Sequence, residues 1–234
     1  TNEHIIPEYI RYHLKKYQIC AFQLIPCLQI DCLTKLIIAE GCKINKIGKY
    51  SFGYCNISDL HIHSELRYLE DGWCKNINHL TNITISDKNK YFKYLENKLL
   101  VGKSAEDSVQ YDTLCFVNRD TDNINLPDSI KVIQEYALSG CKNLRNIMIS
   151  EDSELCTISK KAFYDCPIES FHIPSKLKEI RGGWKTPYLI NISISPNNQN
   201  FIYHKNQLIL GKSDPAKDDF DILHFSRRNI ESVI

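Results

Sequence analysis

Leu33–Cys55 reads LTKLIIAEGCKINKIGKYSFGYC, and Leu144–Cys166, 111 residues further on, reads LRNIMISEDSELCTISKKAFYDC. Both segments are 23 residues long, and their apolar positions coincide. The correspondence continues downstream, where Asn89–Ser104 matches Asn198–Ser213 after a two-residue slip. Self-similarity at a fixed offset is the signature of a repeat protein, in which each unit buries its apolar face against the next.

A shorter motif, apolar-x-x-apolar-x-apolar, recurs within and between these segments. Its last two apolar residues are two positions apart, so both point to one side of a strand. Each copy therefore predicts a short strand with one face in a core. The central residue recurs at steps of about 23 residues, with a step of 41 residues at two equivalent places: Leu36, Leu60, Ile83, Ile124, Ile147, Phe171, Ile192 and Val233.

Each long step contains an insertion with two apolar runs around a polar turn. The first insertion has the runs Tyr94–Gly102 and Tyr111–Val117, and its twin has Tyr203–Gly211 and Asp221–Phe225. Apolar runs separated by a polar turn predict a β-hairpin. We therefore expect two inserted β-hairpins at equivalent places.

A second element follows several of the strands and carries an aromatic residue, as in Ile47–Cys55 and Ile158–Cys166. Trp73 and Trp184 supply the aromatic bulk in two other units. We expect this element to be the returning arm of each coil, a helical turn or tight loop whose aromatic side chain fills the interior. Asp or Ser with Gly or Pro nearby supplies the corners.

The amino end is the least regular part of the chain. His4–Pro7 resembles a strand that ends in Pro, and the apolar residues of Tyr9–Ile25 recur at roughly helical spacing. We interpret residues 1–32 as a degenerate repeat or an N-terminal capping segment, and residues 33–234 as the solenoid.

The solenoid divides into two super-repeats, at about 33–143 and 144–234, with hairpin insertions at about 91–119 and 200–228. The chain begins with Thr1 and its last residues belong to a repeat, so we expect it to be a fragment of a longer protein.

Three motifs together resemble a known family: Leu33-x-x-Leu36-x-Ile38 strands, Ala162-Phe163-x-x-Cys166 returns and Ile173-Pro174-Ser175 corners. Over residues 33–234 the chain resembles the leucine-rich repeats of BspA-like surface proteins of microbes and protozoa. The resemblance implies a solenoid with a parallel β-sheet on its concave face and short helical turns or loops on its convex face. It also implies adhesion to host cells, matrix proteins or other microbes, with no catalytic residues to carry over.

The residues that flank each central position face outward, because side chains alternate along a strand. On the concave face they form a polar surface with few charges, suited to hydrogen-bonding a protein loop or a glycan. Asn and Ser also suit any solvated sheet, and loops or hairpins are alternative binding sites. The candidate binding residues, here called the concave row, are Asp59, His61, Asn82, Thr84, Asn123, Asn125, Asn146, Met148, Ser170, His172, Asn191 and Ser193.

Composition limits the classes of partner. The net charge is only +1, which argues against nucleic acid or an anionic membrane surface as a ligand. The apolar runs are far shorter than the roughly 20 residues that span a bilayer, so we expect no membrane insertion within this fragment.

The ten cysteines raise the question of disulfides or metal. Cys55, Cys141 and Cys166 occupy one repeat position, which Ile77 and Tyr188 fill in other units, so we expect buried structural thiols there. The spacing of Cys20, Cys27 and Cys32 fits no zinc arrangement, and we predict no metal or other cofactor. A disulfide among Cys27, Cys32 and Cys42 remains an alternative for an exported protein.

Three glycosylation sequons begin at Asn56, Asn82 and Asn191, although Asn-Ile-Ser/Thr also satisfies the strand pattern. A glycan on either of the last two would obstruct the concave face. We find no nucleophile motif, phosphate-binding glycine loop or metalloprotease motif, so we predict that the chain is not an enzyme.

The leading hypothesis is a non-enzymatic module that binds protein or carbohydrate at the cell surface or outside the cell. The alternative is an intracellular, cytoplasmic scaffold that packs against other proteins, which many reduced cysteines would favour.

Overall fold

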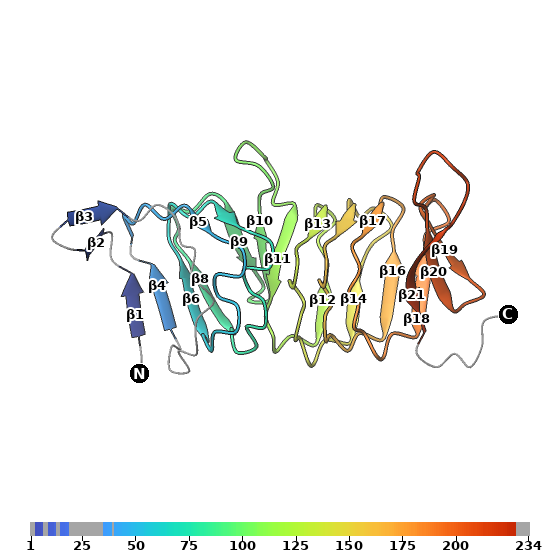
Figure 1. The fold of residues 1–234 in the computed structure, drawn as a ribbon, viewed down its shortest axis with the longest axis horizontal. Coiled ribbons are helices and arrows are strands. Elements are labelled where there is room, and N and C mark those ends of the chain that lie inside the picture. Colours follow the sequence, from blue (N-terminus) through green and yellow to red (C-terminus); the bar gives the residue numbers. More distant parts are fainter. Residues whose placement is uncertain (1–2, 7–8, 13–14, 19–34, 39, 228–234) are drawn as a thin grey trace.

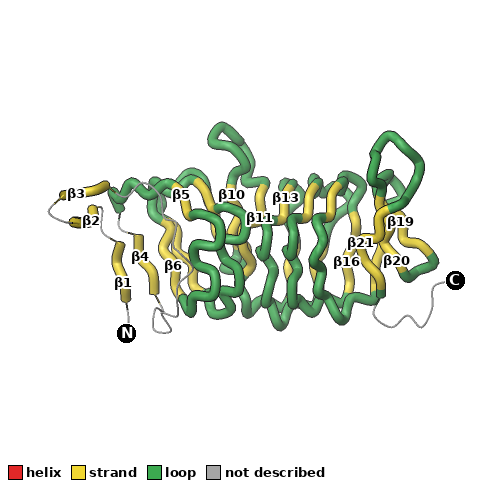
Figure 2. Tube along the Cα trace, in the orientation of Figure 1, coloured by secondary structure: helices red, strands yellow, loops and turns green. Residues whose placement is uncertain are grey.

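The computed structural model describes residues 3–6, 9–12, 15–18, 35–38 and 40–227. Over these residues the chain coils into an elongated solenoid, and the sequence runs along its long axis from one end to the other (Figure 1). Within the described ranges there is no helix, and hence none that could cross a bilayer (Figure 2).

One face carries the strands that the leucine motif predicts, and neighbouring strands run parallel. The central residues of the motif pair across strands, as Leu60 with Ile83, Ile124 with Ile147 and Phe171 with Ile192, so the predicted register is confirmed. The strands of this concave face are β1 (Glu3–Ile6), β4 (Lys35–Ile38), β6 (Asp59–Ile62), β8 (Asn82–Ile85), β12 (Asn123–Asn125), β14 (Asn146–Met148), β16 (Ser170–Ile173) and β18 (Asn191–Ile194).

A second face carries a two-residue strand from each coil. In every pair the second residue is apolar and buried, as in Ile47, Ile133 and Ile158, while the first is less buried. These strands also pair in parallel with their neighbours. They are β5 (Lys46–Ile47), β7 (Tyr68–Leu69), β13 (Val132–Ile133), β15 (Thr157–Ile158) and β17 (Glu179–Ile180).

The returning arms are turns, so the alternative of a helical turn is wrong for the described residues. The third residue after each short strand has a left-handed backbone, with φ of 60° at Tyr50, 72° at Gly72 and 62° at Tyr136. A right-handed helix cannot continue through a left-handed residue. The arms instead bond between coils, with Phe52 N donating to Trp73 O at 3.1 Å and Tyr54 N to Lys75 O at 2.9 Å.

The first insertion is a three-stranded antiparallel meander of β9 (Phe92–Leu95), β10 (Leu99–Gly102) and β11 (Thr113–Val117). The predicted hairpin is confirmed as β10 and β11, and β9 adds a third strand. Both faces of β10 and β11 are buried. Leu99 and Val101 join the core that follows the insertion, whereas Leu100 and Phe116 join the core that precedes it. The meander is therefore a wall across the interior.

The second insertion repeats this arrangement as β19 (Phe201–His204), β20 (Leu208–Gly211) and β21 (Ile222–Ser226). Ile209 and Phe225 point into the preceding core. The loops 103–112 and 212–221 of the two meanders project from the same edge of the solenoid (Figure 1).

Aromatic side chains fill the interior, as the returning arms predict. In the first half, Trp73 lies 6.1 Å from the ring of Phe52 and 5.9 Å from Phe116. In the second half, Trp184 lies 5.0 Å from Phe163 and 5.2 Å from Phe171. Tilted and edge-on ring contacts stabilise a core in addition to the stabilisation that comes from burying apolar area.

Arg119, just after the wall, is almost completely buried. Its Nε donates to Ile77 O at 3.1 Å, its Nη1 to Ala137 O at 2.9 Å and its Nη2 to Tyr136 O at 3.3 Å. The guanidinium also lies 4.2 Å from the centroid of the Phe116 ring. Arg119 thus joins the coil before the wall to the coil after it, where a direct backbone ladder is interrupted.

At the amino end, the strand expected at His4–Pro7 is present as β1, which pairs in parallel with β4. The helical spacing of Tyr9–Ile25 is misleading where the structure describes it. β2 (Tyr9–Tyr12) and β3 (Lys15–Gln18) instead form an antiparallel hairpin. Residues 19–34 lie outside the described part of the chain.

Candidate binding face

The concave row lies on the outer side of the concave sheet, as the alternation of side chains predicts. In β14, for example, Asn146 and Met148 are exposed and Ile147 between them is buried. Four members of the row, in β6 and β16, are half-buried, and the other eight are exposed. The structure therefore brings all twelve residues to one surface.

Neighbouring members of the row hydrogen-bond across the strands. Asn82 Nδ2 donates to Asp59 Oδ1 at 2.7 Å, and Asn146 Nδ2 donates to Asn123 Oδ1 at 3.1 Å. Ser170 Oγ in turn donates to Asn146 Oδ1 at 3.2 Å. These bonds orient the amide and hydroxyl groups before any ligand arrives, which lowers the entropic cost of binding.

The two equivalent histidines each have a carboxylate partner that the strand pattern does not predict. His172 Nδ1 lies 2.8 Å from Ser193 Oγ, and its Nε2 lies 3.1 Å from Glu151 Oε1. The second contact has the distance of an ion pair but not the geometry of a hydrogen bond, because Nε2 has no hydrogen-bond partner. In the first super-repeat, His61 lies 2.9 Å from Thr84 Oγ1 and 3.6 Å from Glu40 Oε1.

A signal for these carboxylates was present in the sequence. Glu40 and Glu151 are separated by the same 111 residues as His61 and His172. The Glu40 carboxylate accepts hydrogen bonds from Ser64 and neighbouring groups, which outweigh partial burial and lower its pKa to about 2. It therefore stays ionised beside His61.

A groove of about 590 Å³ lies at the carboxyl end of the concave face. Its floor comes from β14, β16 and β18, and the β19–β20 turn with the residue after β21 forms one wall. The residues that line it are Ile147, Met148, Ile149, Ser170, Phe171, His172, Ile190, Asn191, Ile192, Ser193, Tyr203, Asn206 and Arg227. Five of them belong to the concave row.

The repeat pattern does not predict Tyr203, Asn206 or Arg227 as groove residues. These residues belong to the inserted meander, and the repeat pattern assigns no position on the concave face to an insertion. Their approach to β18 depends on how the meander packs against the last coil.

The concave face and the arrangement of coils agree with a family match. The model of the BspA type leucine-rich repeat region matches residues 27–98 and 110–204, in six copies. The chain belongs to the BspA type leucine-rich repeat family. Members of this repeat family generally mediate protein interactions.

Solved structures show the same fold for this leucine-rich repeat chain. A leucine-rich repeat protein from Eubacterium ventriosum is 18% identical, with a TM-score of 0.58 over 72% of this chain and 50% of that one. A leucine rich cell surface protein from Faecalibacterium prausnitzii is 16% identical, with a TM-score of 0.52 over 72% of this chain and 49% of that one. The chain spans about half the length of these two proteins. A comparison with curated proteins finds no significant match.

The thiols of the leucine-rich repeats lie mainly in the core. Cys55, Cys141 and Cys166 are buried, as predicted for their repeat position. The equivalence fails at Tyr188, which is 60% exposed, because that unit is shorter and Thr186 is the buried residue instead. Cys20, Cys27 and Cys32 lie outside the described residues. Within the described residues no cluster of His, Cys, Asp and Glu could hold a metal.

The three sequon asparagines Asn56, Asn82 and Asn191 are all exposed. Asn82 already donates its side chain to Asp59, and Asn191 lines the groove. A glycan on Asn191 would therefore fill the groove.

Proposed function

We propose that this chain is a non-enzymatic binding module of a cell-surface protein, and that its concave face engages a protein ligand. The observation that carries the proposal is the set of cross-strand hydrogen bonds between Asp59 and Asn82 and from Asn123 through Asn146 to Ser170. These bonds hold donors and acceptors at fixed positions on a rigid sheet. Such a surface favours a specific polar contact over a nonspecific charged one.

The test uses the double variant Asn146→Arg/His172→Arg, which places two long charged side chains on the face. The ligands are immobilised matrix proteins, host-cell surface proteins and a glycan array. We expect the variant to lose the binding that the wild-type chain has, with an unchanged melting temperature. The matched control, Asn143→Arg/Asn197→Arg, adds the same charge at exposed positions outside the concave row and should bind normally.

If binding survived in the double variant, the ligand would engage the loops or the meanders, and the concave-face proposal would be wrong. Binding only to glycans on the array would reassign the ligand class to carbohydrate.

A cytoplasmic scaffold is the second candidate, and the thiols favour it. Cys74, Cys115, Cys141 and Cys166 are buried and free, which suits a reducing compartment. Labelling intact source cells with a membrane-impermeant reagent separates the two proposals. Labelling of this chain would support the cell surface, and labelling only after permeabilisation would support the scaffold.

A further inference from the structure

The two meanders are structural copies, so their side chains can be compared position by position. Tyr94 pairs with Leu100 in the first, and Tyr203 pairs with Ile209 at the same place in the second. Both loops are closed by the same hydrogen bond, from Ser104 Oγ to Asp112 at 2.7 Å and from Ser213 Oγ to Asp221 at 2.6 Å. A difference between the copies therefore marks a local change in chemistry.

One such difference lies at the residue after the third strand, which is Asn118 in the first copy and Arg227 in the second. Asn118 Nδ2 donates to Tyr94 Oη at 3.2 Å, to Asn97 O at 3.2 Å and to Thr81 O at 2.9 Å. Tyr94 Oη itself donates to Asn97 O at 2.9 Å. The polar groups of Tyr94, Asn97 and Asn118 in the first copy thus hydrogen-bond to one another.

The second copy leaves polar atoms without partners. Arg227 Nη1 donates to Asn206 O at 3.4 Å, equivalent to one bond of Asn118. However, Arg227 Nε and Tyr203 Oη are both buried and have no hydrogen-bond partner among the described residues. Both residues line the groove of the concave face. A buried polar atom without a partner is costly, so a ligand in the groove would be favoured if a small rotation of either side chain brought its donor to the ligand.

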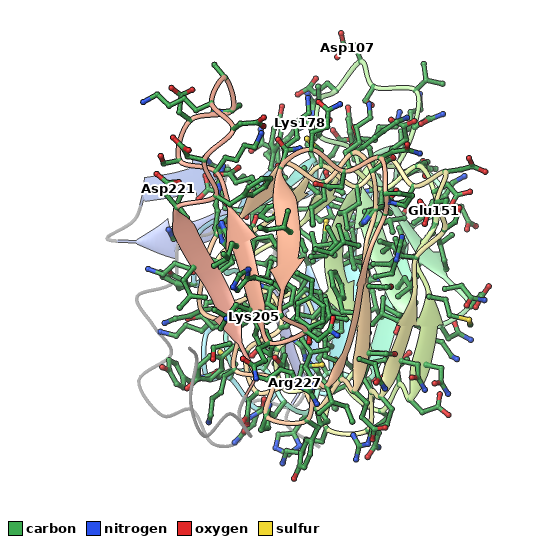
Figure 3. The ribbon with its side chains drawn as sticks, turned by 90° about the vertical axis from the view of Figure 1, so that its right-hand side faces the viewer. Asp107, Glu151, Lys178, Lys205, Asp221 and Arg227 are labelled. Atoms are coloured by element: carbon green, nitrogen blue, oxygen red, sulfur yellow. The ribbon has the colours of Figure 1, made fainter. Side chains whose placement is uncertain are left out.

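The charges on the meander side of the groove indicate the sign of that ligand, whereas on its floor the Glu151 carboxylate lies 3.1 Å from His172 Nε2. The other surface arginines of residues 40–227 have carboxylate partners, as Arg67 has Glu106 and Arg145 has Glu169. Within residues 40–227, neither Arg227 nor Lys205 has an acidic partner. In the end-on view, Lys205 and Arg227 lie at the same end of the meander, and Asp221 lies at the other end (Figure 3).

The apolar residues beside Arg227 indicate the class of ligand. Met148 and Ile190 line the same groove and are 57% and 47% exposed. Arg, Tyr and Met beside exposed aliphatic side chains are the composition of a protein interface. A carboxylate offers two acceptor oxygens, which suit a guanidinium and a phenol hydroxyl.

We propose that this groove accepts an Asp or Glu side chain of a protein segment that lies on the concave face. Arg227 and Tyr203 donate hydrogen bonds to the carboxylate, and Met148 and Ile190 pack against a neighbouring apolar side chain of the segment. This inference rests on the proposed function and adds the chemistry of the bound segment to it.

The probe is a library of random 12-residue peptides displayed on phage and selected against the whole chain. We expect the selected peptides to share an Asp or Glu close to a large apolar residue. A synthetic peptide of that sequence should bind Arg227→Asn at least tenfold more weakly than wild type, and Tyr203→Phe several-fold more weakly. The wild-type affinity should also fall as salt is raised.

Arg227→Asn installs the residue that the first copy carries, so the variant is expected to fold, and its melting curve verifies this. The matched control Tyr94→Phe removes the equivalent phenol hydroxyl from the first meander and should leave peptide affinity unchanged. A selection without an acidic consensus, or equal affinity in Arg227→Asn, would overturn the inference. So would competition by oligogalacturonate stronger than by the peptide, because the carboxylate would then belong to a glycan.

The two proposals fail in different ways. If Asn146→Arg/His172→Arg lost the peptide and Arg227→Asn kept it, the concave face would bind without the carboxylate site. If both variants kept the peptide, the concave-face proposal would fail as well.

Discussion

At the scale of the residue, the returning arms depend on left-handed backbone positions. The third residue after each short strand is Tyr50, Gly72, Tyr136, Lys161 or Gly183, with φ between 57° and 85°. A side chain at such a position costs free energy, so the surrounding packing must impose the turn. Tyr50 and Tyr136 are held by an edge-on ring contact at 6.5 Å and by Lys75, which lies within 6 Å of both rings.

Gly72 must stay a glycine for a second reason, because a β-carbon there would lie 2.4 Å from Tyr50 Cε1. We expect Gly72→Ala to lower the free energy of unfolding by about 3 kcal/mol, from backbone strain plus the clash. Gly41→Ala is the control, since Gly41 has φ of 80° and no atom within 4 Å of the added carbon. It should cost only about 1 kcal/mol in urea unfolding. Equal losses would mean that the Tyr50 ring moves aside freely.

His63 has no exposed surface, and burial lowers the pKa of its imidazole, although Glu40 and Glu65 oppose the shift. The unfolded chain therefore takes up a proton near pH 6.5 that the folded chain resists. The free energy of unfolding should fall as the pH drops from 7 towards 5, and His63→Gln should show a smaller fall. His224 has a pKa lowered by the same cause, so His63→Gln/His224→Gln should flatten the profile further. An unchanged slope in the double variant would contradict this explanation.

At the scale of the element, the strands of the concave face are only three or four residues long. Their register therefore determines which side chains are buried and which are exposed. A shift of one residue would exchange the buried and exposed positions. We expect Ile147→Asp to lower the free energy of unfolding by about 3 kcal/mol or more, because it buries an unpaired charge. Asn146→Asp, one residue away and exposed, should cost less than about 1 kcal/mol. Similar melting curves for the two variants would refute the register.

The wall formed by the first meander is attached to the coils by Arg119. Arg119→Leu removes three hydrogen bonds to backbone carbonyls, of which Ala137 O and Tyr136 O keep a backbone donor, and should lower the free energy of unfolding by about 3 kcal/mol. Arg119→Lys should recover only part of this loss, because one ammonium cannot reach carbonyls on both sides of the wall. Chemical unfolding of the three proteins measures the difference. Full rescue by lysine would show that charge, rather than the planar fork, is what the site requires.

At the scale of the whole molecule, the wall separates two core clusters, one on each side. The cysteines that belong to either cluster are buried. Burial raises the pKa of Cys74 to about 11 and also raises the pKa of Cys115 and Cys166. Alkylation needs the thiolate, so these cysteines should react with N-ethylmaleimide only as fast as the protein unfolds. Among the cysteines of residues 40–227, Cys156, which is half-buried, should react first. Peptide mass spectrometry follows each site, and rapid labelling of Cys115 would mean that the wall opens in the native state.

The repeat fold was predictable because it is written in short-range patterns. Leu60, Ile83 and Ile147 were placed in the core by their spacing alone, and the structure buries all three. The returning arms were less predictable. The alternatives there were a helical turn and a tight loop, and only contacts between coils, such as Phe52 N with Trp73 O, select the loop. The helical spacing of Tyr9–Ile25 was misleading over its described part, because Tyr9–Tyr12 pairs with Lys15–Gln18 and an antiparallel partner outweighs local periodicity.

The sequence by itself determined the solenoid, its register and the side chains that line the concave face. Each of these depends on the pattern within one repeat and on contacts between neighbouring coils. Only the tertiary structure decided where the insertions go and what they touch. The two copies of the meander have different roles. The first is a wall between two core clusters, and the second forms one side of the groove. Asn118 and Arg227 occupy the same position in the two copies, yet one closes a hydrogen-bond network and the other leaves buried donors open. The exchange of Asn for Arg is visible in the sequence, but its consequence is not, because the partners Thr81, Tyr94 and Asn97 of Asn118 are brought to it only by packing between segments far apart in the chain.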